Sequence, residues 1–128
     1  MTARILVVDD EPDALDLARV VLETSGGDVT AVATANEVLS VMRQRTFDAL
    51  VADIGMPEQD GYSLIRAIRS LPAKEGGSIR AIAVTAYTTL RERQEALAAG
   101  FDVHLAKPLD PDRLVAAVAA AVRAESPR

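Results

Sequence analysis

Hydrophobic residues in this chain form short unbroken runs that alternate with longer segments of helical spacing. The unbroken runs lie at residues 5–8, 49–52 and 81–84, and weaker candidates lie at residues 29–33 and 103–106. Continuous apolar runs of strand length, rather than alternating ones, are typical of strands buried on both faces of a parallel sheet. The pattern therefore predicts five buried strands.

Helix signals stand between these runs. Pro12 suits the first turn of a helix, and Asp110 followed by Pro111 suits an N-cap and first helical residue. Residues 34–37 and 89–92 both have the Thr-x-x-Glu spacing of a capping box. Two further segments place apolar side chains on one helical face: Leu64, Ile65, Ile68 and Leu71, and Leu114, Val115, Val118 and Val122. Strict strand–helix alternation predicts an α/β fold, with an open parallel sheet covered by helices on both faces.

Length and composition limit the domain organisation. The chain has 128 residues, with 49% hydrophobic and 26% charged residues, as expected for one globular domain. We expect a single domain over residues 1–124 and a short tail at 125–128. Cysteine is absent, which excludes disulfides, thiolate nucleophiles and cysteine zinc sites.

The charge balance excludes further classes. A net charge of −5 argues against direct nucleic-acid binding, which depends on a basic surface. The longest apolar run, residues 114–122, is too short to cross a bilayer, and residues 5–8 are too few for a signal peptide. We therefore expect a cytoplasmic protein with no membrane contact.

Polar residues follow most of the predicted strands. Asp9 and Asp10 end the first, Asp53 the third, Thr85 the fourth, and Lys107 the fifth. Ligands of open α/β sheets bind outside the carboxyl ends of the strands. These side chains are therefore expected to meet at one edge of the sheet.

Such a group of residues suits magnesium and phosphoryl chemistry. Three carboxylates and one ammonium sum to −2, and two like charges about 4 Å apart repel by about 4 kcal/mol at an effective dielectric constant near 20. A hard divalent cation with oxygen ligands, such as Mg²⁺, relieves that repulsion. The residue types fit transfer of a phosphoryl group onto Asp53, with Lys107 and Thr85 binding its oxygens.

Each residue taken singly also has a structural interpretation. Residues 9–11 are acidic and could complement the dipole of the following helix. Asp53 could form a turn, Thr85 could be an ordinary β-branched strand residue, and Lys107 could be a solvated loop lysine. Their joint position at strand ends is what favours a functional site.

The chain resembles the receiver domains of response regulators in two-component signalling, from Ile5 to about Val122. The resemblance rests on these segments: residues 7–11 (VVDDE), 53–57 (DIGMP), 60–61 (DG), 85–86 (TA) and 107–108 (KP). It implies a flavodoxin-like (βα)₅ domain with strand order 2-1-3-4-5. Residues 98–108 look most like the receivers attached to hybrid histidine kinases.

The resemblance also implies roles for individual residues. Asp53 is the expected phosphoacceptor. Asp10 is expected to bind Mg²⁺ directly, Asp9 through water, and Gly55 through its backbone carbonyl, with Asp53 as a further ligand. In the same way, Thr85 is expected to hydrogen-bond the phosphoryl group.

Lys107 is expected to pair with the phosphoryl group, across a cis bond to Pro108. Two positions depart from the family pattern. His104 occupies a place where the family commonly has Tyr or Phe, and we favour a partly exposed strand residue over a pH sensor. Tyr87 stands where small or polar residues are frequent. Its ring is expected to hinder the water that hydrolyses phosphoaspartate.

The leading functional hypothesis is a phosphorylation switch. A histidine kinase or histidine phosphotransfer protein donates the phosphoryl group, and a downstream protein reads the face of the fourth helix, fifth strand and fifth helix. Arg91, Glu95, Val103 and Arg113 are candidates on that face, and a weak homodimer is a possible further partner. The domain is expected to accept phosphate once, without enzymatic turnover.

Two alternatives come from other classes. A Mg²⁺-dependent aspartyl-phosphate phosphohydrolase needs a second acid–base group and a substrate pocket, usually from an inserted cap for which this chain has no spare length. A nucleotide- or flavin-binding module needs a Gly-rich phosphate loop after the first strand, where residues 9–11 are acidic.

Overall fold

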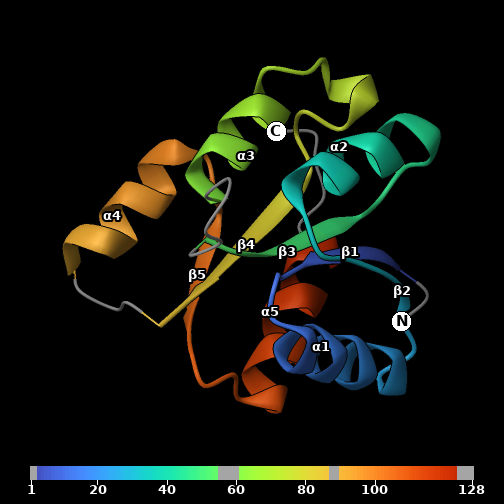
Figure 1. Ribbon diagram of the computed structural model, residues 1–128, viewed down its shortest axis with the longest axis vertical. Coiled ribbons are helices and arrows are strands. Elements are labelled where there is room, and N and C mark those ends of the chain that lie inside the picture. Colours follow the sequence, from blue (N-terminus) through green and yellow to red (C-terminus); the bar gives the residue numbers. More distant parts are fainter. Residues whose placement is uncertain (1–2, 55–60, 87–89, 124–128) are drawn as a thin grey trace.

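The computed structural model describes residues 3–54, 61–86 and 90–123. Five parallel strands form one sheet in the order β2-β1-β3-β4-β5 (Figure 1). The strands are β1 (Arg4–Val8), β2 (Asp28–Val32), β3 (Ala49–Asp53), β4 (Arg80–Thr85) and β5 (Val103–Ala106). The α/β class and the strand order expected from the sequence are both confirmed.

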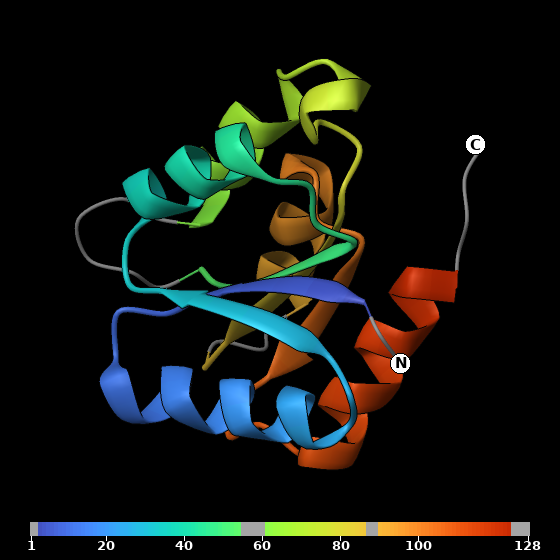
Figure 2. The same cartoon turned by 90° about the vertical axis from the view of Figure 1, so that its right-hand side faces the viewer.

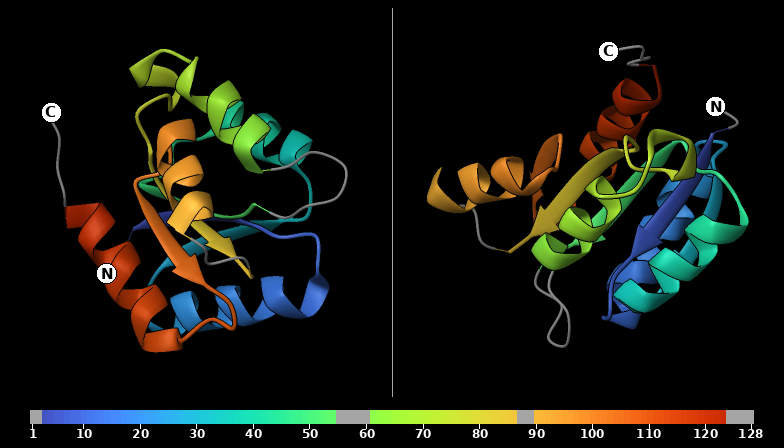
Figure 3. Two further views of the ribbon diagram at one scale, coloured as in Figure 1. Left: turned by 90° about the vertical axis from the view of Figure 1, so that its left-hand side faces the viewer. Right: turned by 90° about the horizontal axis from the view of Figure 1, so that it is seen from above.

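Helices cover both faces of this sheet (Figures 2 and 3). The helices are α1 (Pro12–Thr24), α2 (Ala35–Gln44), α3 (Gly61–Arg69), α4 (Leu90–Ala99) and α5 (Pro111–Arg123), with a short 3₁₀ turn at Ala73–Glu75. Helices α1 and α5 pack on one face, and α2, α3 and α4 pack on the other. None of the helices in the described ranges is long and apolar enough to cross a membrane.

Strand side chains alternate between two separate cores. On β1, Ile5 and Val7 join the core beneath α1 and α5, whereas Leu6 and Val8 join the core beneath the other three helices. Successive residues of a strand point to opposite faces of the sheet, so a strand buried on both faces must be apolar at every position. This is why the apolar runs predicted the three inner strands to within one residue at each end. The expectation of five buried strands is wrong for β2 and β5, which are only partly buried because they lie at the edges of the sheet.

Local capping groups fix where three helices begin. Glu11 caps α1 by accepting hydrogen bonds from the backbone amides of Asp13 and Ala14. Thr34 and Glu37 form the predicted capping box of α2, and Asp110 accepts from the amide of Asp112 at the start of α5. The second predicted capping box includes residue 89, which lies outside the described residues.

Helices α3 and α4 are buried to very different extents. Helix α3 buries Leu64, Ile65 and Ile68 completely. Helix α4 buries only the small side chains of Ala96 and Ala99, while both of its leucines, Leu90 and Leu97, are exposed. The sheet edge at β5 is therefore less heavily covered than the sheet centre.

Candidate functional site

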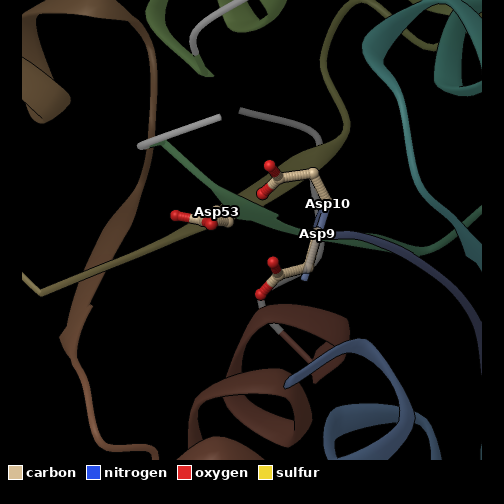
Figure 4. Close-up of side chains that lie close together, drawn as sticks. All are labelled: Asp9, Asp10 and Asp53. Carbon is tan, nitrogen blue, oxygen red and sulfur yellow. The ribbon is translucent and has the colours of Figure 1, made fainter. Parts of the chain in front are cut away.

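Three carboxylates meet at the carboxyl end of the sheet. Asp53 is the last residue of β3, the central strand, and Asp9 directly follows β1 beside it. One oxygen from each of Asp9, Asp10 and Asp53 lies within 4.8 Å of the others, and Figure 4 shows the three side chains grouped around a common space. The convergence predicted from strand ends is confirmed for these residues.

Strand periodicity explains how the aspartates come together. Asp9 continues the side-chain series of Ile5 and Val7, and Asp53 continues that of Ala49 and Val51. Both series face α1 and α5, so both carboxylates emerge on the same side of neighbouring strands. They are largely buried, with 7% of Asp9 and 9% of Asp53 exposed, whereas Asp10 is exposed.

Lys107 reaches the same carboxylates from the loop after β5. Its Nζ lies 3.3 Å from Oδ2 of Asp9 and 3.4 Å from Oδ2 of Asp53. Its backbone amide donates to the carbonyl of Thr85 at 2.8 Å, and the bond from Lys107 to Pro108 is cis, as expected. One ammonium group therefore bridges two of the three acids.

The acidic triplet at residues 9–11 divides between two roles. The carboxylate of Glu11 caps α1, so the helix-dipole interpretation holds for this residue. Asp9 directs Oδ2 toward Lys107, while its Oδ1 accepts a hydrogen bond from the amide of Glu11 at 2.9 Å. The hydrogen bond from Glu11 fixes the orientation of the Asp9 side chain.

The electrostatics of the site favour a bound cation. Burial raises the pKa of the Asp9 carboxyl, and the nearby charge of Asp53 raises it further, against the opposing effects of the Glu11 amide and Lys107. Burial lowers the pKa of Lys107, but the charges of Asp53 and Asp9 and its hydrogen bonds to them outweigh this and leave it raised. Lys107 thus stays protonated, yet one positive charge leaves the three carboxylates uncompensated.

The donor set fits a hard divalent ion. All three candidate ligands are carboxylate oxygens, two on buried side chains and one exposed to solvent. Mg²⁺ prefers oxygen ligands, uses one or two carboxylates and keeps several waters, so a half-open carboxylate site suits it.

Thr85 and His104 belong to β4 and β5, the last two strands of the sheet. Thr85 ends β4, is 1% exposed, and lies one position beyond Val84, which pairs with Asp53. His104 is a half-buried residue of β5 opposite Ala83, consistent with the strand position favoured above. Gly55 and Tyr87, predicted as a metal ligand and a modulator of hydrolysis, lie outside the described residues.

A second charge cluster at the other end of the sheet was not predicted. The Arg69 guanidinium donates to the backbone carbonyls of Gly100, Gly77 and Ile79. It also binds Asp102, whose carboxylate accepts from the amide of Ala81. No short-range motif joins residues 69 and 102, so only their contact in space identifies the pair.

Comparison with known proteins gives the family context. The model of the response regulator receiver domain matches residues 5–119. The chain is 47% identical over 111 residues to an uncharacterised 14.6 kDa protein of Leptolyngbya boryana, covering 87% of this chain and 83% of that protein.

A second relative is a much larger sensor. The chain is 34% identical over 116 residues to the sensor protein GacS of Pseudomonas syringae, covering 90% of this chain but only 13% of GacS. Among solved structures, a CheY-like receiver domain protein of Methanospirillum hungatei is 30% identical with a TM-score of 0.84, covering 95% of this chain and 94% of that one.

Proposed function

This chain belongs to the response regulator receiver domain family, and from that premise we propose that Asp53 accepts a phosphoryl group from a phosphohistidine. The single observation that carries the proposal is the position of Asp53. Its buried carboxylate ends the central strand, within 4.8 Å of two other aspartates and 3.4 Å from Lys107. An isolated structural aspartate has no need of such neighbours.

The proposed transfer is a single displacement at phosphorus. An oxygen of Asp53 attacks, a P–O bond forms, and the P–N bond to the donor imidazole breaks, with the bonding electrons leaving on the imidazole nitrogen. Asp53 then carries about −2 instead of −1. Lys107, already near Asp53, donates a charge-assisted hydrogen bond to the new oxygens, and the Thr85 hydroxyl donates a neutral one.

Mg²⁺ is the proposed cofactor, because three carboxylates are too negative to receive a phosphoryl group unaided. Asp10 and Asp53 would bind it directly, Asp9 through water, and the backbone carbonyl of Gly55 would complete the protein ligands. When bound, the ion neutralises charge that develops on the transferred oxygens. Asp9 and Asp10 thus serve to hold the ion, and Asp53 to react.

The donor is proposed to be a histidine kinase or a histidine phosphotransfer protein. This proposal is supported by the similarity to part of a sensor protein. The proposed readout surface for a downstream protein is the α4-β5-α5 face, where a coupling of about 1–3 kcal/mol changes partner affinity about 5- to 150-fold. The domain limits 1–124, the cytoplasmic location and a weak homodimer stay predictions.

Substituting the acceptor tests this function. Asp53→Asn should abolish acid-labile phosphate uptake from a small phosphodonor in Mg²⁺, because an amide oxygen is a far poorer nucleophile than a carboxylate. Asp112→Asn, an exposed change in the first turn of α5, is the matched control and should label normally. Removing Mg²⁺ with a chelator should also prevent labelling.

The stoichiometry separates the switch from a phosphohydrolase. A receiver takes up one phosphate per chain, whereas an enzyme releases many phosphates per chain from excess donor. Continued labelling of Asp53→Asn, or rapid multiple turnover by the wild-type protein, would refute the proposal.

A further inference from the structure

A groove lies at the amino end of the sheet, opposite the end that holds the three aspartates. It consists of two cavities, of about 590 Å³ and 310 Å³. The larger lies between α2 and the end of α3, and the smaller reaches the start of β4 and the end of α5. The residues that line both cavities are Met42, Arg45, Thr46, Lys74 and Glu75. Because they share these residues, the two cavities form one elongated amino-end groove.

The floor of the amino-end groove is apolar and adaptable. Met42 lines both cavities and is 8% exposed. A side chain at Gly76 would meet the end of Met42 at 2.5 Å, so the glycine leaves room for that side chain. Methionine is flexible and adapts its shape to a bound partner. Leu71 in the larger cavity and Val122 in the smaller extend the apolar floor to both ends of the groove.

The amino-end groove carries excess positive charge on an acidic protein. Four cations and two acids line it, a net charge of +2, whereas the whole chain has a net charge of −5. The cations are Arg43, Arg45, Lys74 and Arg80, and the acids are Asp48 and Glu75. The side chains of Arg43 and Lys74 are exposed and make no hydrogen bond or ion pair within the described ranges. The groove therefore attracts anionic groups.

The loop between α2 and β3 adds free backbone donors to the same groove. The amides of Thr46 and Phe47 donate no hydrogen bond to any of the described residues, and neither does the Thr46 hydroxyl. On either side of them, the amides of Arg45 and Asp48 donate to backbone carbonyls at 3.0 and 2.7 Å. The loop is thus fixed at both ends, and two successive donors between them remain for water or a ligand.

The opposite rim of the groove is held in place in a similar way. Lys74 lies in the 3₁₀ turn after α3, where the amides of Glu75 and Gly76 donate to preceding carbonyls at 2.9 and 3.1 Å. The Arg69 guanidinium binds the carbonyl of Gly77 at 2.9 Å. Both rims are therefore ordered before a ligand arrives, which lowers the entropic cost of binding.

We propose that the amino-end groove binds an extended acidic segment of a partner protein. Carboxylates of that segment pair with Arg43 and Lys74, and a backbone carbonyl accepts a hydrogen bond from the amide of Thr46. Apolar side chains on either side of the carboxylates enter the two cavities. An extended segment fits better than a helix, because the carbonyls of a helix are already bonded within it. The binding goes beyond the phosphorylation switch and uses neither Asp53 nor the α4-β5-α5 face.

The test uses two peptides of about eight residues, long enough when extended to span both cavities. One has a leucine on each side of two adjacent glutamates, and its twin has glutamine at both glutamates. Fluorescence anisotropy with unphosphorylated protein should show at least about fivefold tighter binding of the glutamate peptide, the size of one exposed ion pair. Added salt should reduce this difference. In NMR spectra, the amide shifts of Thr46 and Phe47 should change most.

Variants of this chain locate the contact. Arg43→Gln and Lys74→Gln should each weaken binding of the glutamate peptide about fivefold and leave the glutamine peptide unaffected. Arg66→Gln is the matched control, because Arg66 is an exposed arginine of α3 that lines neither cavity. It removes the same charge and should bind both peptides as the wild-type protein does.

Four results would overturn the proposal. They are equal affinity for the two peptides, no saturable binding of the glutamate peptide up to about 1 mM, and an equal loss in Arg66→Gln and Arg43→Gln. The fourth is a protein that dimerises through this groove, with sedimentation showing a dimer that Lys74→Gln dissociates. Asp53→Asn should bind both peptides normally, so failure of this binding and failure of the proposed phosphorylation give different results.

Discussion

The two ends of the sheet hold charge clusters built on opposite principles. At the carboxyl end, Asp9, Asp10 and Asp53 share the single ammonium of Lys107. At the amino end, Arg69 and Arg80 both bind Asp102, and the remaining donors of Arg69 reach backbone carbonyls. The first cluster has excess negative charge, whereas in the second each group has a partner of opposite polarity.

This difference separates stability from function. Arg69 joins the end of α3 to the residues that precede β4 and β5, so its hydrogen bonds stabilise the native chain directly. The aspartates instead repel one another at partly buried positions, which disfavours folding but leaves the site ready for a cation. A cluster that keeps excess charge of one sign is the better candidate for binding a counter-ion from outside the chain.

The largest expected effect is at the amino end. Arg69→Gln should lower the free energy of unfolding by about 1.5–3 kcal/mol, because carbonyls and the Asp102 carboxylate lose charged donors. Urea unfolding measures this. Arg69→Lys should recover only part of the loss, since an ammonium lacks the planar fork of donors.

The matched control for this prediction is Arg66→Gln. Arg66 lies on the same helix and is exposed, and its side chain makes no hydrogen bond or ion pair among the residues described. Its substitution should change stability by less than about 0.5 kcal/mol. Similar losses in both variants would show that the cluster at Arg69 is no more stabilising than an ordinary surface charge.

An effect of opposite sign is expected at the carboxyl end. In Mg²⁺-free buffer, Asp9→Asn should raise the free energy of unfolding, on the order of 1 kcal/mol, by removing a buried charge. Folding raises the pKa of Asp9 above its ordinary value of 3.8. Between pH 3.8 and the raised pKa, the native protein therefore binds more protons than the unfolded chain. The gain in the free energy of unfolding of Asp9→Asn over the wild-type protein should therefore vanish below pH 3.8 and reach its full size at neutral pH.

Adding Mg²⁺ sharpens the same experiment. Millimolar Mg²⁺ should stabilise the wild-type protein more than Asp9→Asn, because binding to the native state adds to its stability and the variant binds the ion less well. Thermal unfolding at several Mg²⁺ concentrations measures the stabilisation of the wild-type protein and that of Asp9→Asn. If Asp9→Asn is less stable than the wild-type protein in Mg²⁺-free buffer, the ion pair between Asp9 and Lys107 outweighs the burial of the Asp9 charge and its repulsion by Asp53.

The smallest effect should come from Arg80→Gln. Its guanidinium lies 3.6 Å from Asp102, and both side chains are partly exposed, at 20% and 35%. A pair of this kind contributes up to about 1 kcal/mol. The loss in urea unfolding should be clearly smaller than in Arg69→Gln, and an equal loss would assign the stability of this cluster to charge rather than to hydrogen bonds with the backbone.

The three inner strands could be predicted because burial on both faces leaves a direct mark on the sequence. An apolar residue is required at every position, as in Ala49, Leu50, Val51 and Ala52, and the first polar residue then marks the strand end. Asp53 is such a residue, so its place at the carboxyl end of a strand followed from local sequence alone. The cluster of Arg69, Arg80 and Asp102 leaves no such mark. In the sequence alone, these residues cannot be distinguished from ordinary surface arginines and aspartates.

The chain's own sequence determined the alternation of elements, the helix caps and the residue types that meet at the strand ends, since each depends on neighbours a few positions apart. Only the folded molecule decided which charges are paired and that both leucines of α4 stay exposed to solvent. It also decided that Nε2 of His104 has no hydrogen-bond partner in the described residues. Those properties depend on distances between residues remote in sequence. Packing sets these distances, and no local pattern encodes them.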